Sequence, residues 1–178
     1  MELEYLQQPP RRYTFEMDKL KKFVEKWCIG KTLNLFGGKV RLMVREVSND
    51  IDTNMPTDYH MDAYEFVKKC KKNFFDTVIL DPPYNFRKSM EKYGGRYMTD
   101  YPIIMDKVME ITTQNARVIT LGYNTGGMGT IRGFKKIALC IVNHGAGHND
   151  TLCLVEEKIR NMCNKGAFVD YIEKNEYK

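Results

Sequence analysis

Apolar residues recur along this chain at two spacings, one typical of helices and one typical of strands. In DKLKKFVEKW, residues 18–27, they fall three or four positions apart, which places them on one face of a helix. In FDTVIL, residues 75–80, strand-forming residues follow one another almost without a break, as in a buried strand of a parallel sheet. The pattern therefore predicts an amphipathic helix closed by Gly30 and a buried strand that ends at Leu80.

The two patterns alternate along the rest of the chain. Further strands, the third of them brief, are predicted at residues 31–36, 41–47, 58–61, 116–123, 134–144 and 151–159. Further helices are predicted at residues 63–72 and 102–111. Because strands alternate with helices and the last two strands form a hairpin, we predict an α/β fold with a mostly parallel sheet and helices on both faces.

The chain is predicted to be one domain. Its 178 residues suffice for a single sizeable core, and no repeat, low-complexity tract or linker divides residues 1–178. We expect a flexible arm at residues 1–12 and a polar tail at residues 161–178. No apolar run has the length of a membrane span, and the N-terminus lacks the apolar segment of a secretory signal. We therefore expect a cytoplasmic protein with no membrane partner.

Composition narrows the candidate chemistry only slightly. The five cysteines are scattered and never spaced as CxxC, which argues against a zinc site or a disulfide framework. We therefore expect reduced thiols and no bound metal. The net charge of +5 permits a polyanionic partner such as nucleic acid without requiring one. More specific indications of function have to come from motifs.

Polar or glycine-rich residues follow four of the predicted strands, where open parallel α/β sheets bind their ligands. In chain order they are Gly37 and Gly38, Asp50 and Asp52, Asp62, and Asp81 to Tyr84. Glycines let a ligand approach the backbone, an acid after the second strand commonly binds a ribose hydroxyl pair, and the next acid could accept from an adenine amino group. Taken alone, each group also fits a structural role: the glycines fit a turn, Asp50 or Asp52 fits an Asx turn, and Asp62 fits a helix N-cap. Their order along the chain favours ligand binding.

The stretch Asp81-Pro82-Pro83-Tyr84 has parts that fit one reaction, the transfer of a group to an exocyclic amine of a nucleobase. The lone pair of such an amine is delocalised into the ring. A carboxylate and a backbone carbonyl that each accept one N–H would hold the nitrogen and favour its pyramidal form. Two prolines fix the direction of that carbonyl, and a tyrosine can stack on a base that has left its duplex. The structural alternative is a Pro-Pro turn with Tyr84 in the core.

The segment LDPPYNF, residues 80–86, resembles the motif of the amino-methyltransferases, which transfer a methyl group from S-adenosyl-L-methionine to adenine N6 or cytosine N4. The mark of that family is Asp, Asn or Ser, then Pro-Pro and an aromatic residue, after the fourth strand of the sheet. The Asp form is the commoner one in the adenine enzymes. The resemblance covers roughly residues 14–158. It implies a Rossmann-like class I methyltransferase fold with a C-terminal antiparallel hairpin.

The resemblance also implies a cofactor and a set of site residues. The cofactor is S-adenosyl-L-methionine. Contact with it is implied for Tyr13, Thr14, Phe36, Gly37, Gly38, Asp50 (or Asp52), Asp62 and Asp81. A catalytic role is implied for Asp81, Pro82, Pro83 and Tyr84.

The chain departs from the family pattern in its cofactor loop. LNLFGGKV has Asn34 where the family has an acid and Val40 where it has its last glycine. Few residues separate Gly37 from the second predicted strand, so the first crossover helix must be shortened or missing. We also expect no separate target-recognition domain. Recognition of the target base sequence would then depend on residues 85–100, residues 124–133, the tail or a partner chain. That partner could be a second copy of the same chain in a homodimer.

Two loops are candidates for contact with nucleic acid. In residues 85–100, four cations interleave with tyrosines, which suits backbone phosphates and base stacking, although an ordinary solvated loop fits equally well. These cations are Arg87, Lys88, Lys92 and Arg96. In HGAGHND, residues 144–150, His144, His148 and Asn149 could touch the target strand, but a plain hairpin turn is the favoured interpretation.

These features predict a methyltransferase that acts on adenine N6 in DNA by direct transfer to a flipped base. One alternative is an RNA base amino-methyltransferase, because a Pro-Pro-aromatic motif also occurs in enzymes that methylate RNA amines. Another is a catalytically silent, methyltransferase-like subunit that binds nucleic acid for an active partner. A nicotinamide oxidoreductase is set aside because no Gly-x-Gly-x-x-Gly follows the first predicted strand.

Overall fold

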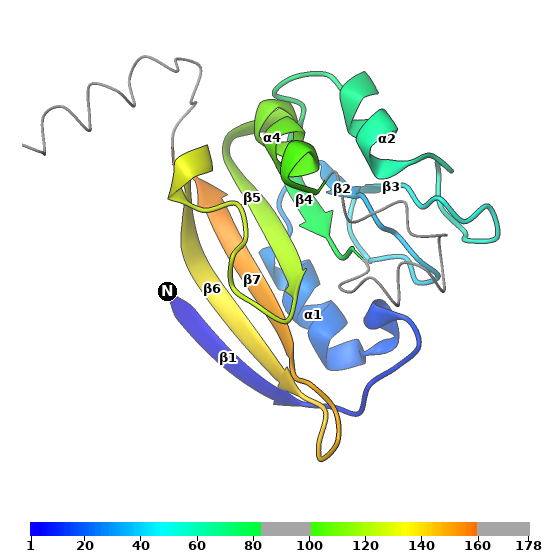
Figure 1. The fold of residues 1–178 in the computed structure, drawn as a ribbon, viewed down its shortest axis with the longest axis vertical. Coiled ribbons are helices and arrows are strands. Elements are labelled where there is room, and N and C mark those ends of the chain that lie inside the picture. The colour runs from blue at the N-terminus through cyan, green and yellow to red at the C-terminus, as the bar shows by residue number, and fades with distance from the viewer. Residues whose placement is uncertain (83–100, 160–178) are drawn as a thin grey trace, which may run out of the picture.

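The computed structural model describes residues 1–82 and 101–159, which form one mixed sheet flanked by helices (Figure 1). Within the described residues the sheet has seven strands in the order β1-β6-β7-β5-β4-β2-β3. The strands are β1 (Glu2–Gln7), β2 (Thr32–Asn34), β3 (Glu46–Ser48), β4 (Phe75–Leu80), β5 (Thr112–Gly122), β6 (Phe134–Asn143) and β7 (Thr151–Lys158). The helices are α1 (Asp18–Trp27), α2 (Ala63–Lys69) and α4 (Tyr101–Ile111), with 3₁₀ turns η1 (Thr14–Glu16) and η2 (Thr130–Arg132).

The sheet is mostly parallel, and the predicted fold class is confirmed. β2 pairs in parallel with β3 and β4, β4 pairs in parallel with β5, and the edge strand β1 pairs in parallel with β6. Of the described strands only β7 runs the other way, antiparallel to both β5 and β6. The carboxyl ends of the parallel strands therefore meet at one edge of the sheet, where such folds form their ligand sites.

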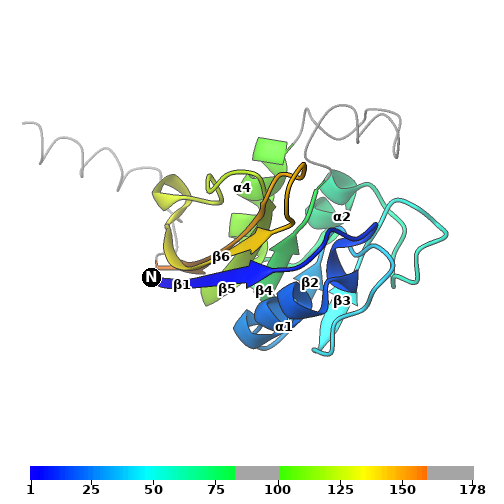
Figure 2. The same cartoon turned by 90° about the horizontal axis from the view of Figure 1, so that it is seen from below.

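Helices cover both faces of the sheet, and successive residues of a central strand face two different cores. Val78 and Leu80 of β4 pack in the core beneath α2 and α4, whereas Ile79 between them packs in the core beneath α1. Figure 2 shows α1 on one side of the strands and α2 and α4 on the other. Burial on both faces explains the almost continuous apolar run of residues 75–80.

Helix α1 occupies the residues predicted for it, and its apolar stripe is buried against the sheet. It ends where Cys28 adopts an extended backbone and donates its N–H to the carbonyl of Val24. Gly30 follows with φ +52°, a left-handed conformation that costs glycine little, so the chain can turn there into β2.

The expectation of a flexible arm at residues 1–12 is wrong, because residues 2–7 form the edge strand β1. This strand pairs with β6 along its whole length. Its side chains are mostly exposed, and Leu6 is the one that packs against the α1 core. Backbone pairing with a strand more than 130 residues away holds β1 in place. Such an edge strand has no long apolar run by which the sequence could predict it.

The first crossover is shortened as predicted, since residues 35–45, between β2 and β3, contain no helix. Leu42 is buried in the α1 core, with Val40 and Val44 packed beside it. These side chains supply the apolar cover that a crossover helix would otherwise give to this part of the sheet.

Several element boundaries differ from the predicted ones. The second predicted strand is shorter and later than residues 41–47, because β3 covers only Glu46–Ser48. Residues 58–61 form no strand and contribute one isolated bridge, from Tyr59 to Asn49. β5 begins at Thr112, earlier than the predicted residue 116.

Among the described residues no helix has the length and apolar character needed to cross a membrane.

Candidate active site

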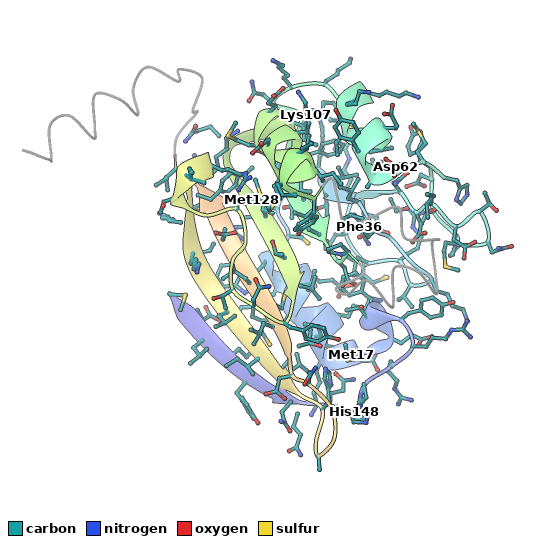
Figure 3. All side chains as sticks on the ribbon, in the orientation of Figure 1. Met17, Phe36, Asp62, Lys107, Met128 and His148 are labelled. Carbon is teal, nitrogen blue, oxygen red and sulfur yellow. The ribbon has the colours of Figure 1, made fainter. Side chains whose placement is uncertain are left out.

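A cavity of about 700 Å³ opens at the carboxyl ends of the strands. Its walls come from the connector between β1 and α1, the glycine loop after β2, the turn after β3, the end of β4 and the β6–β7 hairpin. Met17, Phe36 and His148, labelled in Figure 3, belong to three of these walls. Sites for small molecules typically measure ~300–1,000 Å³, so the cavity has a suitable size for a ligand.

Most of the residues predicted for the site line this one cavity. They are Tyr13, Thr14, Phe36, Gly37, Gly38, Asp50, Asp81 and Pro82. Asp52, the alternative ribose acid, lines it as well. Pro83, Tyr84 and the cations Arg87, Lys88, Lys92 and Arg96 lie outside the described residues, and their roles stay predictions.

The glycine loop is held against the end of β3. The N–H of Gly37 donates to the carbonyl of Asn49 at 2.7 Å, and the N–H of Gly38 donates to Asp50 Oδ2 at 2.9 Å. A Cβ on Gly37 would lie 2.8 Å from the methyl carbon of Thr57, and Gly38 has φ +60°. Both positions therefore require glycine, for close packing at the first and for backbone conformation at the second.

Asp50 and Asp52 occupy different environments, and Asp50 is the better candidate for the ribose acid. Asp50 is 5% exposed, and its two oxygens accept from the N–H groups of Gly38 and Asp52, each at 2.9 Å. Asp52 instead forms an Asx turn with Asn54, whose backbone and side-chain N–H groups lower the pKa of Asp52. Asp50 is thus the carboxylate fixed beside the glycine loop.

Asn49 organises this edge of the sheet, although the sequence assigned it no role. Its Nδ2 donates to the carbonyls of Met61 at 2.9 Å and Leu35 at 3.3 Å, and its Oδ1 accepts from the N–H of Met61 at 3.1 Å. One amide therefore links the end of β2 to the chain that enters α2. The available signal was an amide residue two positions after the predicted strand at residues 41–47.

Asp62 is the N-cap of α2. Its Oδ1 accepts from the N–H groups of Tyr64 at 2.9 Å and Glu65 at 3.2 Å. It does not belong to the residues that line the cavity, and Figure 3 shows it beside α2, away from Met17 and His148. The structural role weighed for Asp62 accounts for this geometry, so its contact with an adenine ring remains a prediction without support from the cavity lining.

The segment before α1, for which the resemblance implies contact with the cofactor, lines the cavity. Tyr13 and Glu16 cap the short turn η1 reciprocally: the N–H of Tyr13 donates to Glu16 Oε2 at 3.3 Å, and the N–H of Glu16 donates to the carbonyl of Tyr13 at 3.1 Å. The ring of Tyr13 lies 3.9 Å from where a Cβ on Gly38 would be. Tyr13 therefore faces the glycine loop across this end of the cavity.

Asp81 and Pro82 follow β4 directly and form part of the cavity wall. Asp81 is half-buried. Burial, with a smaller contribution from the charge of Asp81, raises the pKa of Tyr101 at the start of α4. A neutral phenol is therefore the form of Tyr101 that lies within electrostatic reach of Asp81.

The β6–β7 hairpin supplies a wall of the cavity, which goes beyond the plain turn favoured from the sequence. His148 and Asn149 are exposed and line the cavity. His144 is structural at both ring nitrogens: Nδ1 lies 2.8 Å from the carbonyl oxygen of Gln8, and Nε2 lies 2.8 Å from Thr151 Oγ1.

Within residues 1–82 and 101–159, no group of three or more His, Cys, Asp or Glu side chains is arranged to hold a metal ion.

Several solved structures that are similar to this chain are methyltransferases. The chain is similar to 1,6-didemethyltoxoflavin-N1-methyltransferase from Burkholderia thailandensis, whose structure contains S-adenosylhomocysteine, with a TM-score of 0.57 and 8% identity over 80% of this chain and 78% of that chain. The chain has the Rossmann-like methyltransferase fold.

Two further structures with this methyltransferase fold are also similar to the chain. They are the N-methyltransferase NodS from Bradyrhizobium japonicum (TM-score 0.54, 8% identity, 80% of this chain and 98% of that chain) and an S-adenosylmethionine-dependent methyltransferase from Archaeoglobus fulgidus (0.53, 10%, 79% and 91%). No protein-family model and no curated protein sequence matches the chain. At such low identities the similarity shows the fold alone.

Within this fold, one cavity brings the glycine loop and Asp50 together with the carboxylate of Asp81. Sequence reasoning missed part of its lining: Arg11, Arg12, Lys39 and Tyr123. The two arginines lie in the segment expected to be flexible, and Tyr123 sits at the end of β5. For the two arginines, the only signal in the sequence was a pair of adjacent cations after two prolines.

Proposed function

We propose that the protein is an S-adenosyl-L-methionine-dependent methyltransferase that acts on an exocyclic amine of a nucleobase, with adenine N6 in DNA as the leading substrate. The observation that carries the proposal is the shared cavity: Asp81 and Pro82 line it together with Gly37, Gly38 and Asp50. A carboxylate suited to an amine and a wall suited to a nucleoside therefore face the same space.

The residues of the first wall fit the cofactor. Asp50 is a buried carboxylate at the cavity, where it suits a pair of ribose hydroxyls, and it also fixes the N–H of Gly38. Gly38 carries no side chain, which leaves backbone surface for a ligand to approach beside Tyr13, whereas the space at Gly37 is filled by Thr57. When bound, the cofactor supplies an electrophilic methyl group on a sulfonium.

Asp81 and Pro82 would position the amine. The carboxylate of Asp81 accepts one N–H and the carbonyl of Pro82 accepts the other, so the nitrogen becomes pyramidal and its lone pair points at the methyl carbon. The bound cofactor would supply the methyl group to the nitrogen and keep its sulfur as a thioether, while Asp81 would receive the proton that the nitrogen loses. Orientation of this kind accounts for ~7–11 kcal/mol of barrier in well-aligned reactions. Tyr84 is predicted to stack on the base.

The test is transfer of labelled methyl from S-adenosyl-L-methionine to unmethylated DNA and to RNA in parallel, with the products digested to nucleosides. We expect N6-methyladenine from DNA. Asp81→Ala should lower the rate on the order of 100-fold or more, because the amine is no longer oriented. Asp106→Ala, which removes an exposed carboxylate of α4, is the matched control and should leave the rate within about twofold.

Each other outcome selects a different function. Methylation of RNA alone would replace DNA by an RNA base amine as the substrate. Cofactor binding without transfer to either polymer would direct the search to other amines. Absence of both cofactor binding and transfer would favour the silent subunit, for which the Asn34 substitution in the first motif is the supporting feature. Target recognition by a homodimer or a partner subunit remains part of the proposal.

A further inference from the structure

Three cations line the cavity without a carboxylate partner among the described residues. They are Arg11, Arg12 and Lys39, all exposed. By contrast, Arg41 pairs with Asp58 and Arg132 pairs with Asp106. These three exposed cations form no salt bridge with a described carboxylate, so they are available to an anionic ligand, although Asp50, Asp52 and Asp81 line the same cavity.

The two arginines are held in place, because their connector is fixed at both ends. At one end the N–H of Gln8 donates to the carbonyl of Asn143 at 3.0 Å, and the carbonyl of Gln8 lies 2.8 Å from His144 Nδ1. At the other end Tyr13 and Glu16 form their reciprocal cap. Between Gln8 and Tyr13 stand only two prolines and the two arginines, and proline restricts the backbone further. The connector is therefore a short segment in the cavity wall, fixed to the edge strand β1 and to the β6–β7 hairpin.

Lys39 reaches the same place from the glycine loop. Its Nζ lies 5.8 Å from the centroid of the Tyr13 ring, and the Arg12 guanidinium carbon lies 5.5 Å from the same centroid. The ring of Tyr13 is thus close to cations from two segments that are far apart in the sequence, at distances typical of cation–π contacts. His148 and Asn149 of the hairpin line the cavity too.

We propose that Arg11, Arg12 and Lys39 form a phosphate-binding rim that holds the backbone of a nucleic acid strand beside the base being methylated. The inference rests on the proposed function and adds a binding site to it, distinct from the predicted cations of residues 85–100. A nucleic acid strand offers one phosphate for each nucleotide, so it can satisfy all three cations at once. The single carboxylate of the cofactor's amino-acid moiety can satisfy only part of this set.

The experiment compares the wild-type protein with the triple variant Arg11→Gln, Arg12→Gln, Lys39→Gln. Binding of a single-stranded DNA, a duplex DNA and an RNA oligonucleotide is measured at a series of salt concentrations. Cofactor binding is measured separately by calorimetry. The matched control is Lys22→Gln, Arg45→Gln, Lys71→Gln, which removes three exposed cations that lie outside the cavity lining.

We expect the triple variant to bind the preferred oligonucleotide on the order of 100-fold more weakly at about 0.1 M salt, with the difference shrinking toward 1 M. The slope of log K against log salt should become shallower by roughly 2 to 3, because each phosphate contact contributes ~0.7–0.9. Cofactor affinity should stay within about twofold. The control variant should keep most of the wild-type affinity and slope.

Two results would overturn the rim. In one, the triple variant binds nucleic acid with the wild-type slope. In the other, it loses cofactor affinity while its nucleic acid affinity is unchanged, which would assign the cations to the cofactor. Failure of the wild-type protein to bind any of the three oligonucleotides is a different outcome, because it would remove the proposed function itself. Comparison of the oligonucleotides decides between DNA and RNA.

Discussion

At the scale of single residues, the site depends on short hydrogen bonds that place backbone and carboxylate groups at the cavity. Asp50, after β3, accepts from Gly38, after β2, and Asn49 beside Asp50 links Leu35 to Met61. These bonds could not be foreseen from spacing alone, since the partners belong to different segments of the chain. The same geometry separates Asp50 from Asp52, which the sequence left as alternatives.

The first prediction concerns this pair of acids. Asp50→Asn should weaken cofactor binding by about 10- to 100-fold, because charge-assisted hydrogen bonds of ~1.5–3 kcal/mol are lost. Asp52→Asn should change it by less than about threefold, because Asp52 serves its own turn. Titration calorimetry measures both, with circular dichroism to confirm folding. Equal losses in the two variants would refute the assignment of the ribose acid to Asp50.

At the scale of elements, the described chain forms its layers with few and short helices. Edge strand β1 extends the sheet beyond β6, and apolar loop residues replace the first crossover helix. Helix α4 ends against a buried lysine: Lys158 Nζ of β7 donates to the carbonyls of Met109 at 2.6 Å and Thr112 at 2.8 Å. A cation at this end of a helix also complements its dipole.

The second prediction follows from that lysine. Lys158→Met keeps the apolar stem but leaves the carbonyls of Met109 and Thr112 without this donor in a buried place. We expect the free energy of unfolding to fall by about 2–3 kcal/mol. Lys135→Met, at an exposed ion pair with Glu157, should cost less than about 1 kcal/mol. Urea denaturation measures the free energy of unfolding of both variants. Equal losses would mean that the buried hydrogen bonds of Lys158 contribute no more than the exposed ion pair of Lys135.

At the scale of the whole molecule, the cavity exists only because separate segments converge on one edge of the sheet. Packing of the sheet also buries two carboxylates that do not line this cavity. Burial raises the pKa of Glu46 on β3, although Arg41 partly opposes the shift, and burial likewise raises the pKa of Glu156 on β7. An acid with a raised pKa in the folded state loses its proton first in the unfolded state. Its contribution to stability therefore falls as pH rises from its ordinary value of ~4.3 through the raised folded value.

The third prediction tests this linkage through Glu46. In Glu46→Gln the position stays neutral, so the free energy of unfolding should exceed that of the wild type at neutral pH and approach it as pH falls below ~4.3. Urea denaturation at a series of pH values measures the difference. Glu65→Gln, at an exposed position on α2, should show no comparable dependence on pH. A difference that does not vary with pH would exclude Glu46 as its source.

Some features of this protein follow from its sequence by itself. Apolar spacing determined α1, β4 and the closing hairpin, because side-chain periodicity directly reflects which face of an element is buried. The pair Gly37-Gly38 and the stretch from Asp81 to Pro82 follow predicted strands, and in a parallel sheet such strand ends converge. The cavity position of these residues could therefore be anticipated.

Only the tertiary structure decided the rest, because those features depend on partners that are distant in the sequence. β1 is a strand through its pairing with β6, and the connector that carries Arg11 and Arg12 is fixed by Asn143 and His144. Asp62 became a helix cap and Asp50 a cavity carboxylate through hydrogen bonds that residue type alone does not select. Spacing predicts which residues share a face or a strand end, whereas the atoms that each side chain contacts are set by the packing of the complete sheet.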